Sequence, residues 1–125
     1  MRKNCMAFGI VFFLCILFIG CNDSAEVKTV KNGYLTSYPD ATIGEAFDGF
    51  FGSPEWSSKK SDDGLVYVNA KGKMYYLEKE IESVIQFKIN ADESFEIYAV
   101  EFNGIPQNVL MIGGLMAKIF ELADD

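Results

Sequence analysis

The sequence predicts an α+β domain with a short N-terminal helix, a four-stranded antiparallel meander sheet and a C-terminal helix packed on that sheet. The spacing of apolar residues supports this fold class. They recur at the helical period just after Thr42 and again over residues 109–122, and at a period of two residues between these segments. A helix, then consecutive strands, then a helix is the order typical of an α+β domain.

The N-terminal segment has the pattern of a secretory signal peptide. A basic pair, Arg2 and Lys3, precedes an apolar run over residues 6–19, and the chain turns polar after Cys21. The run fits the roughly 7–15 apolar residues of a signal peptide better than the roughly 20 of a membrane-spanning helix. The alternatives are an uncleaved membrane anchor and the signal peptide of an ordinary secreted chain.

Residues 17–21, Leu-Phe-Ile-Gly-Cys, resemble the lipobox of bacterial lipoproteins, in which a small residue precedes a diacylglycerol-bearing cysteine. Phe18 departs from the family's usual aliphatic residue at that position. The resemblance implies a signal peptide over residues 1–20, a lipid anchor with chains such as palmitate on Cys21, a tether over 21–31 and one domain over 32–125. It also implies an extracytoplasmic place in the cell envelope. Asn22 stands where an aspartate would retain an enteric lipoprotein, which implies the periplasmic face of the outer membrane in a Gram-negative organism.

Cysteine and charge content exclude several classes of function. All three cysteines lie within residues 5–21, so the mature chain would contain no disulfide. Removal of Arg2 and Lys3 from the 11 basic side chains leaves 9 against 18 acidic ones, a net charge of −9. Such a surface repels phosphate backbones, so we expect no nucleic-acid partner. The chain has no histidine, and we expect neither a metal site nor a cofactor.

The first part of the mature chain predicts a tether and one helix. Residues 22–31 are expected to form a polar tether that ends in a short strand at 27–30. Thr42 and Glu45 form a capping box, because the Thr42 hydroxyl can accept the Glu45 amide while the Glu45 carboxylate reaches back to the Thr42 amide. The helix that follows is expected to end near Gly52.

The two-residue period predicts the sheet. We expect four strands, at residues 55–60, 65–71, 78–90 and 95–102. Asp63-Gly64 is the hairpin turn between the first two strands. In the last strand, Ile97 and Ala99 are expected to face the core and Tyr98 the opposite side. The apolar segment 74–77 is either a loop or the beginning of the third strand.

The C-terminal segment 109–122 predicts a helix that contains two adjacent glycines. Gly113 and Gly114 cost such a helix about 2 kcal/mol in intrinsic propensity. We expect Gly113 and Ala117 to lie where the helix contacts the sheet closely, with Val100 and Phe102 covered beneath it on the otherwise polar face. A lipid-facing or dimerising helix is the alternative.

The polar side chains form no recognisable catalytic set. Glu78, Glu80 and Glu82 line one strand face, where like charges are expected to stay in water rather than to converge on calcium. Lys59 and Lys60 lie near serines but lack the Ser-x-x-Lys spacing of a serine–lysine dyad. We therefore expect a protein that is not an enzyme, with an envelope hydrolase as the least favoured alternative.

Aromatic side chains supply the candidate binding residues. Tyrosine and tryptophan dominate protein interfaces because they bury a large area and keep a polar tip. We expect Trp56, Tyr67 and Tyr98 to form a surface that binds an envelope protein, with Trp56 as the first choice. The leading interpretation is a non-catalytic protein-binding or envelope-assembly module. The alternative is an inhibitor or immunity-type lipoprotein whose acidic surface matches a basic enzyme.

Short motifs of the mature chain resemble those of small bacterial lipoproteins of unknown function. They are Val30-Lys31-Asn32-Gly33, Tyr38-Pro39, Thr42-Ile43-Gly44-Glu45-Ala46-Phe47 and Asn103-Gly104-Ile105-Pro106-Gln107-Asn108. The order of a helix and four strands is also similar to the repeat of the β-lactamase-inhibitor protein and to small outer-membrane assembly lipoproteins. These resemblances imply an α+β fold and transfer no functional residue.

Overall fold

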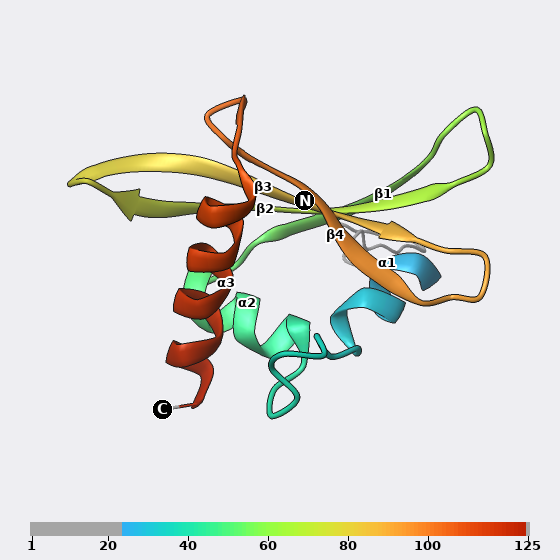
Figure 1. Ribbon diagram of the computed structural model, residues 1–125, viewed down its shortest axis with the longest axis horizontal. Coiled ribbons are helices and arrows are strands. Elements are labelled where there is room, and N and C mark those ends of the chain that lie inside the picture. The colour runs from blue at the N-terminus through green and yellow to red at the C-terminus, as the bar shows by residue number, and fades with distance from the viewer. Residues whose placement is uncertain (1–23, 125) are drawn as a thin grey trace, which may run out of the picture.

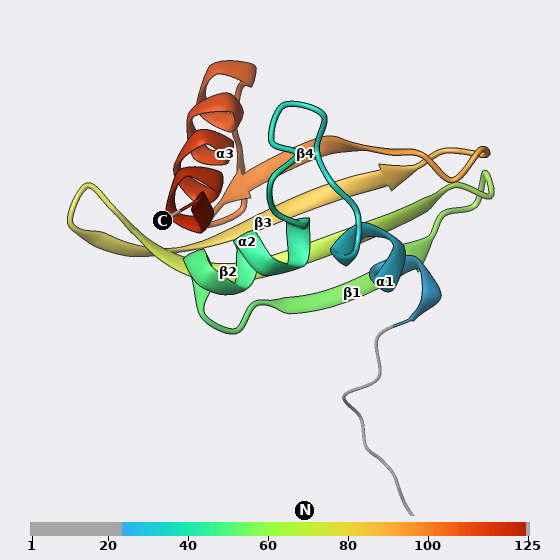
Figure 2. The same cartoon turned by 90° about the horizontal axis from the view of Figure 1, so that it is seen from below.

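Five strands form one antiparallel sheet in the order β1-β2-β3-β4-β5, and the three helices of the described chain lie on one of its faces (Figures 1 and 2). The computed structural model describes residues 24–124, so the predicted signal peptide and Cys21 lie outside the described residues. The elements are α1 (Ala25–Lys31), α2 (Ile43–Phe51), β1 (Glu55–Lys60), β2 (Val66–Tyr76), β3 (Lys79–Ile89), β4 (Phe95–Phe102), β5 (Ile105–Pro106) and α3 (Val109–Asp124). The predicted α+β class and antiparallel meander are confirmed, with β5 as an additional short strand.

The segment predicted as a tether ending in a strand at 27–30 is instead helix α1, so that prediction was wrong. The Ser24 hydroxyl caps the helix by accepting the backbone N–H of Val27 at 3.2 Å. Val27 and Val30, three residues apart, both point into the core and are buried. A helix of seven residues is marginal in water by itself, so burial of these valines stabilises it.

Helix α2 begins at the predicted capping box. The Glu45 N–H donates to the Thr42 hydroxyl at 3.1 Å, and the Thr42 N–H donates to a Glu45 carboxylate oxygen at 3.0 Å. The helix ends at Gly52, whose φ of +85° only glycine adopts readily. Both helix ends lie where the sequence predicts them.

Strand β2 is longer than the sequence predicts. It runs on through Tyr76 and pairs with β3 along its whole length, so the apolar segment 74–77 belongs mainly to the second strand. Leu77 and Glu78 then form a two-residue turn with φ values of +53° and +66°. Such a turn favours Asn-Gly, which the chain uses at 103–104, and is strained with leucine and glutamate.

A bulge in β4 reverses the predicted facing of its last residues. Phe87 pairs with Ile97 but Gln86 pairs with Ala99, so Tyr98 is an extra residue opposite β3. Beyond the bulge, Val100 faces the helices, whereas Ala99 shares the other face. The prediction that Ala99 faces the core and Val100 the polar face was therefore wrong. One additional residue shifts a period of two by one position.

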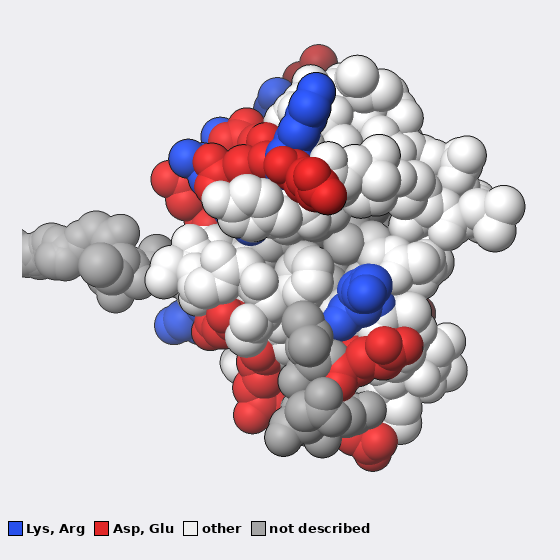
Figure 3. All heavy atoms as spheres, turned by 90° about the vertical axis from the view of Figure 1, so that its left-hand side faces the viewer, with Lys and Arg blue, Asp and Glu red and all other residues white. Residues whose placement is uncertain are grey.

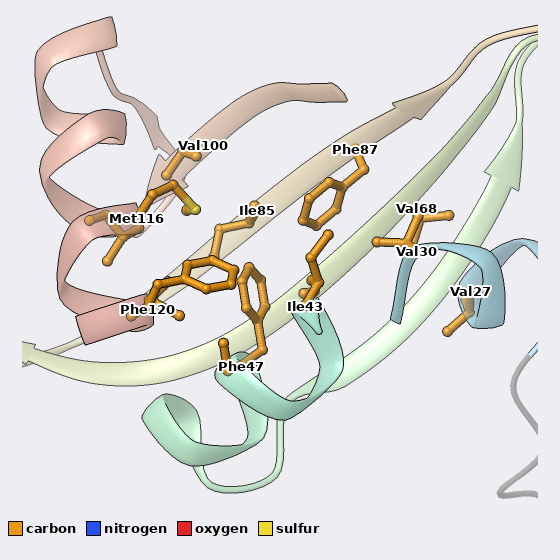
Figure 4. Packing of buried hydrophobic residues seen from close by; sticks show 14 of the residues in the cluster. Val27, Val30, Ile43, Phe47, Val68, Ile85, Phe87, Val100, Met116 and Phe120 are labelled. Carbon is orange, nitrogen blue, oxygen red and sulfur yellow. The ribbon is translucent and has the colours of Figure 1, made fainter. Parts of the chain in front are cut away.

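The core lies between the helices and the face of the sheet that we call the inner face, which carries Val68, Ile85 and Val100 (Figure 4). Phe47 of α2 is fully buried at its centre, with ring centroids 5.9 Å from Phe87 and 6.4 Å from Phe120. Fully burying one aromatic side chain of this kind contributes on the order of 2–3 kcal/mol.

Helix α3 packs on this core through a different side from the one predicted. Its buried residues are Leu115, Met116, Ile119 and Phe120. Gly113 is exposed, and a β-carbon added there would meet nothing within 4 Å. The predicted close contact of Gly113 with the sheet was therefore wrong, because the buried stripe of the helix is made of the four larger residues that follow it.

Candidate functional site

The face of the sheet away from the helices, which we call the outer face, is not covered by any described element (Figure 1). Cross-strand pairing aligns its side chains in rows. One row is Ser57, Asn69, Gln86 and Ala99, and the next contains Lys59, Tyr67, Lys88 and Glu96. A sheet with one solvated face is common among antiparallel folds. An open face by itself therefore does not indicate a binding site.

Two of the predicted binding residues meet on the outer face. The ring centroids of Tyr67 and Tyr98 lie 5.2 Å apart, and the Lys88 ammonium lies 5.9 Å from the centre of the Tyr98 ring. Partial burial raises the pKa of Tyr67 above its ordinary value, and the neighbouring Tyr98 raises it further. Tyr67 therefore stays a neutral hydroxyl that can donate and accept hydrogen bonds. The bulge at Tyr98 brings the two rings together.

Next to this pair the outer face has two shallow hollows, of about 380 and about 200 Å³. Asn69 and Val84 line both of them. The Asn69 Oδ1 atom is buried and accepts no hydrogen bond from any described residue. An unpaired buried acceptor costs about 1–3 kcal/mol. Because this atom is buried, a donor from outside the domain could reach it only if the Asn69 side chain moved.

The third predicted binding residue, Trp56, lies on the inner face. It is half-buried, with its ring centroid 5.6 Å from that of Phe47 and 6.4 Å from that of Phe87, and the Lys31 ammonium lies 5.8 Å from its ring. The sheet separates it from Tyr67 and Tyr98. The signal was present in the sequence, since the hairpin turn at Asp63-Gly64 pairs Trp56 with Ala70 of the core.

The carboxylates that invite a catalytic or metal-binding interpretation stay apart. Glu80 stands opposite Tyr75 and Glu82 opposite Lys73 across the β2–β3 ladder. Within the part of the chain that the structure describes, no three acidic, cysteine or histidine side chains gather closely enough to hold a metal ion. Asp63 accepts the hydroxyl of Ser61 and, at 3.1 Å, the backbone N–H of Leu65. These hydrogen bonds lower the pKa of Asp63 and stabilise the hairpin turn.

A second surface, which sequence reasoning did not single out, is an apolar groove of about 440 Å³ at the β2–β3 end of the molecule. Its walls come from α2, α3 and the ends of β2 and β4. They include Phe50, Met74, Tyr76, Phe102, Met111 and Leu115. The segment 74–77 and the helical period of 109–122 were its sequence signals, but only the fold brings them together.

No helix of residues 24–124 is long and apolar enough to cross a membrane. Comparisons with protein-family models, with curated proteins and with solved structures found no match.

Proposed function

We propose that this chain is an extracytoplasmic lipoprotein, anchored through Cys21, that acts as a non-catalytic protein-binding module of the cell envelope. The observation that carries the proposal is the pair of tyrosines, Tyr67 and Tyr98, on the open outer face. Tyrosine side chains provide a large contact area at a low entropic cost and keep a hydroxyl for hydrogen bonds.

The bulge supports a functional role for the pair. Bulges re-aim side chains, are common next to functional sites, and weaken the ladder where they occur. Here the bulge leaves Tyr98 without a cross-strand partner and turns it toward Tyr67, which pairs with Lys59 on one side and Lys88 on the other. The unpaired Asn69 acceptor lies in the adjoining row of the same face. An aromatic pair with hydroxyl tips suits a protein partner that supplies apolar area and hydrogen-bonding groups.

The proposed anchor would orient the domain for this role. Ser24 begins α1 only three residues after Cys21, a span of roughly 10 Å when fully extended. Because α1 lies in the helical layer (Figure 2), so short a tether would keep the helical side near the membrane. The outer face would then point away from the lipid, toward other envelope proteins.

A pull-down from detergent-solubilised envelopes tests the binding surface. The chain with Tyr67→Ala and Tyr98→Ala should lose its partner, whereas Tyr34→Ala should keep it. Tyr34 is a matched control, because both it and Tyr98 are 55 % exposed. Equal capture by the unaltered chain, the doubly substituted chain and the Tyr34→Ala chain would exclude the tyrosine pair as the binding surface. Capture of a strongly basic enzyme would favour the inhibitor or immunity-type alternative, which the net charge of −9 supports.

A separate experiment tests the anchor. Replacement of Cys21 by serine should abolish incorporation of labelled fatty acid and release the chain from the membrane fraction. Two acyl chains are needed for stable anchoring, because one chain alone binds only marginally. An intact leader with an unmodified Cys21 in the mass spectrum of the native protein would refute the lipoprotein proposal.

A further inference from the structure

Helix α3 has a second apolar face that the core does not cover. Val109 and Leu110, in its first turn, are each 85 % exposed. Leu110, Gly113, Gly114 and Ala117 follow one another at helical spacing along the side away from Leu115 and Ile119. An exposed apolar face on a helix that already packs in a core calls for a second contact.

Three more exposed apolar side chains lie at or near the groove, among charged residues of the β2–β3 hairpin such as Glu78 and Glu80. Tyr75 lines the groove, Leu77 lies in the turn of the β2–β3 hairpin, and Ile105 pairs with Phe102 of the groove wall. All three side chains are between 64 % and 78 % exposed. A fully exposed side chain of this size presents roughly 150–220 Å². The exposed areas of these three side chains, added to those of Val109 and Leu110, therefore sum to roughly 700 Å². The largest apolar patch of a typical monomer is about 300–600 Å². A stable interface of standard size takes about 800 Å² from each partner.

The exposed first turn of α3, with Val109 and Leu110, projects as a ridge beside the groove. Leu110 of α3 directly precedes Met111, which lines the groove with Phe102 and Tyr76. A two-fold symmetric interface requires a patch that is complementary to itself, with a projection and a matching hollow side by side. The surface meets this requirement, and a groove for a small molecule would need no such ridge.

We propose that a second copy of this chain covers this surface in a two-fold symmetric dimer, with Leu110 of each copy in the groove of the other. The two α3 helices would cross antiparallel at Gly113 and Gly114. A β-carbon at either glycine would meet nothing in the monomer, so no contact within the chain requires glycine there. At a crossing, the missing side chains let the two helix backbones approach closely.

Charge favours this face over the others for contact between copies. Two chains of net charge −9 repel each other, and a dimer must form where charges are sparse. Among the described residues that line the groove, Lys118 is the charged one. Figure 3 shows charged side chains in two regions of this end of the molecule, at the upper left and in the lower half, with uncharged areas between them and at the right.

Disulfide cross-linking of the full chain in its own membranes tests the dimer. A Gly113→Cys chain should form, on mild oxidation, a species of twice the chain mass, since position 113 lies next to the proposed two-fold axis. Tyr34→Cys, in the loop between α1 and α2 and outside the residues that line the groove, should not. The unaltered chain reports any link through Cys5, Cys15 or Cys21. Adding Leu110→Glu to Gly113→Cys should abolish the doubled species, and adding Tyr34→Glu should leave it.

The outcomes separate the possible occupants. Leu110 is so exposed that glutamate there should not change the thermal unfolding midpoint, which confirms that lost cross-linking is not lost folding. Only single chains with Gly113→Cys, a cross-link to a protein of another mass, or labelling at position 113 by a photoreactive phospholipid would each overturn the dimer. None of these results bears on capture through Tyr67 and Tyr98, so the proposed function is tested independently.

Discussion

Replacement of Gly72 by alanine should destabilise the domain although alanine is normally the better residue in a strand. Gly72 is buried in β2, and a β-carbon there would lie 2.6 Å from two ring atoms of Phe51 and 2.9 Å from its Cβ. The strand cannot withdraw easily, because Gly72 pairs with Ser83, whose buried hydroxyl donates to the Gly72 carbonyl at 3.2 Å. The Phe51 ring must therefore move out of its place against the core.

Overpacking of this kind costs about 1–3 kcal/mol in the free energy of unfolding. In a domain of this size each kcal/mol lowers Tm by roughly 4–8 °C. Gly49→Ala is the matched control, because Gly49 lies in α2 with open space around its Cα. The same substitution there should stabilise by about 1 kcal/mol through helix propensity. Both variants change the unfolded chain alike, so their difference reports the folded state.

Urea unfolding followed by circular dichroism measures both free energies. In a double-mutant cycle, Gly72→Ala should cost about 1 kcal/mol less in the Phe51→Ala background, because alanine at position 51 removes the two ring atoms that lie 2.6 Å from the added β-carbon. A Gly72→Ala chain as stable as the Gly49→Ala chain would refute the close approach of the Phe51 ring to the Gly72 backbone.

Three further predictions follow from the described contacts. Phe47→Ala should lower the free energy of unfolding by about 3–5 kcal/mol, measured by urea unfolding, because it empties the centre of the core; a loss below about 1 kcal/mol would contradict that position. Glu93→Gly should stabilise by about 1 kcal/mol in the same assay, because Glu93 has a φ of +70° that glycine adopts without strain, and an unchanged midpoint would argue against the strain. Hydrogen bonds from the Thr42 backbone and hydroxyl lower the pKa of Glu45 from its ordinary value of 4.5. The ionised carboxylate therefore stabilises the folded state above pH 4.5, and this contribution to the free energy of unfolding is lost as the pH falls through the lowered pKa. In an NMR titration, Thr42→Ala should raise the Glu45 midpoint part of the way toward 4.5, because the backbone N–H at position 42 still donates to the carboxylate. An unmoved midpoint would show that the Thr42 hydroxyl does not stabilise the carboxylate.

Local chemistry determined much of the fold from sequence alone. The capping box of Thr42 and Glu45 and the stop at Gly52 placed α2, because these residues act on backbone groups within one helical turn. Asp63-Gly64 placed the first hairpin and its register for the same reason. The two-residue period predicted the buried side of β3, since alternation along a strand needs no knowledge of its neighbours.

The tertiary structure decided what depends on contacts between distant segments. The bulge at Tyr98 exists because β4 must pair with β3, and it reversed the facing of Val100 and brought Tyr98 to Tyr67. Helix α1 is stable through the burial of its two valines rather than through its own seven residues. Trp56 packs against the core and is half-buried, whereas Leu110 is exposed although both are apolar. Burial depends on which surface the neighbouring elements cover. Side-chain type and spacing specify local structure, whereas the exposed faces available for binding are specified only when the whole chain has packed.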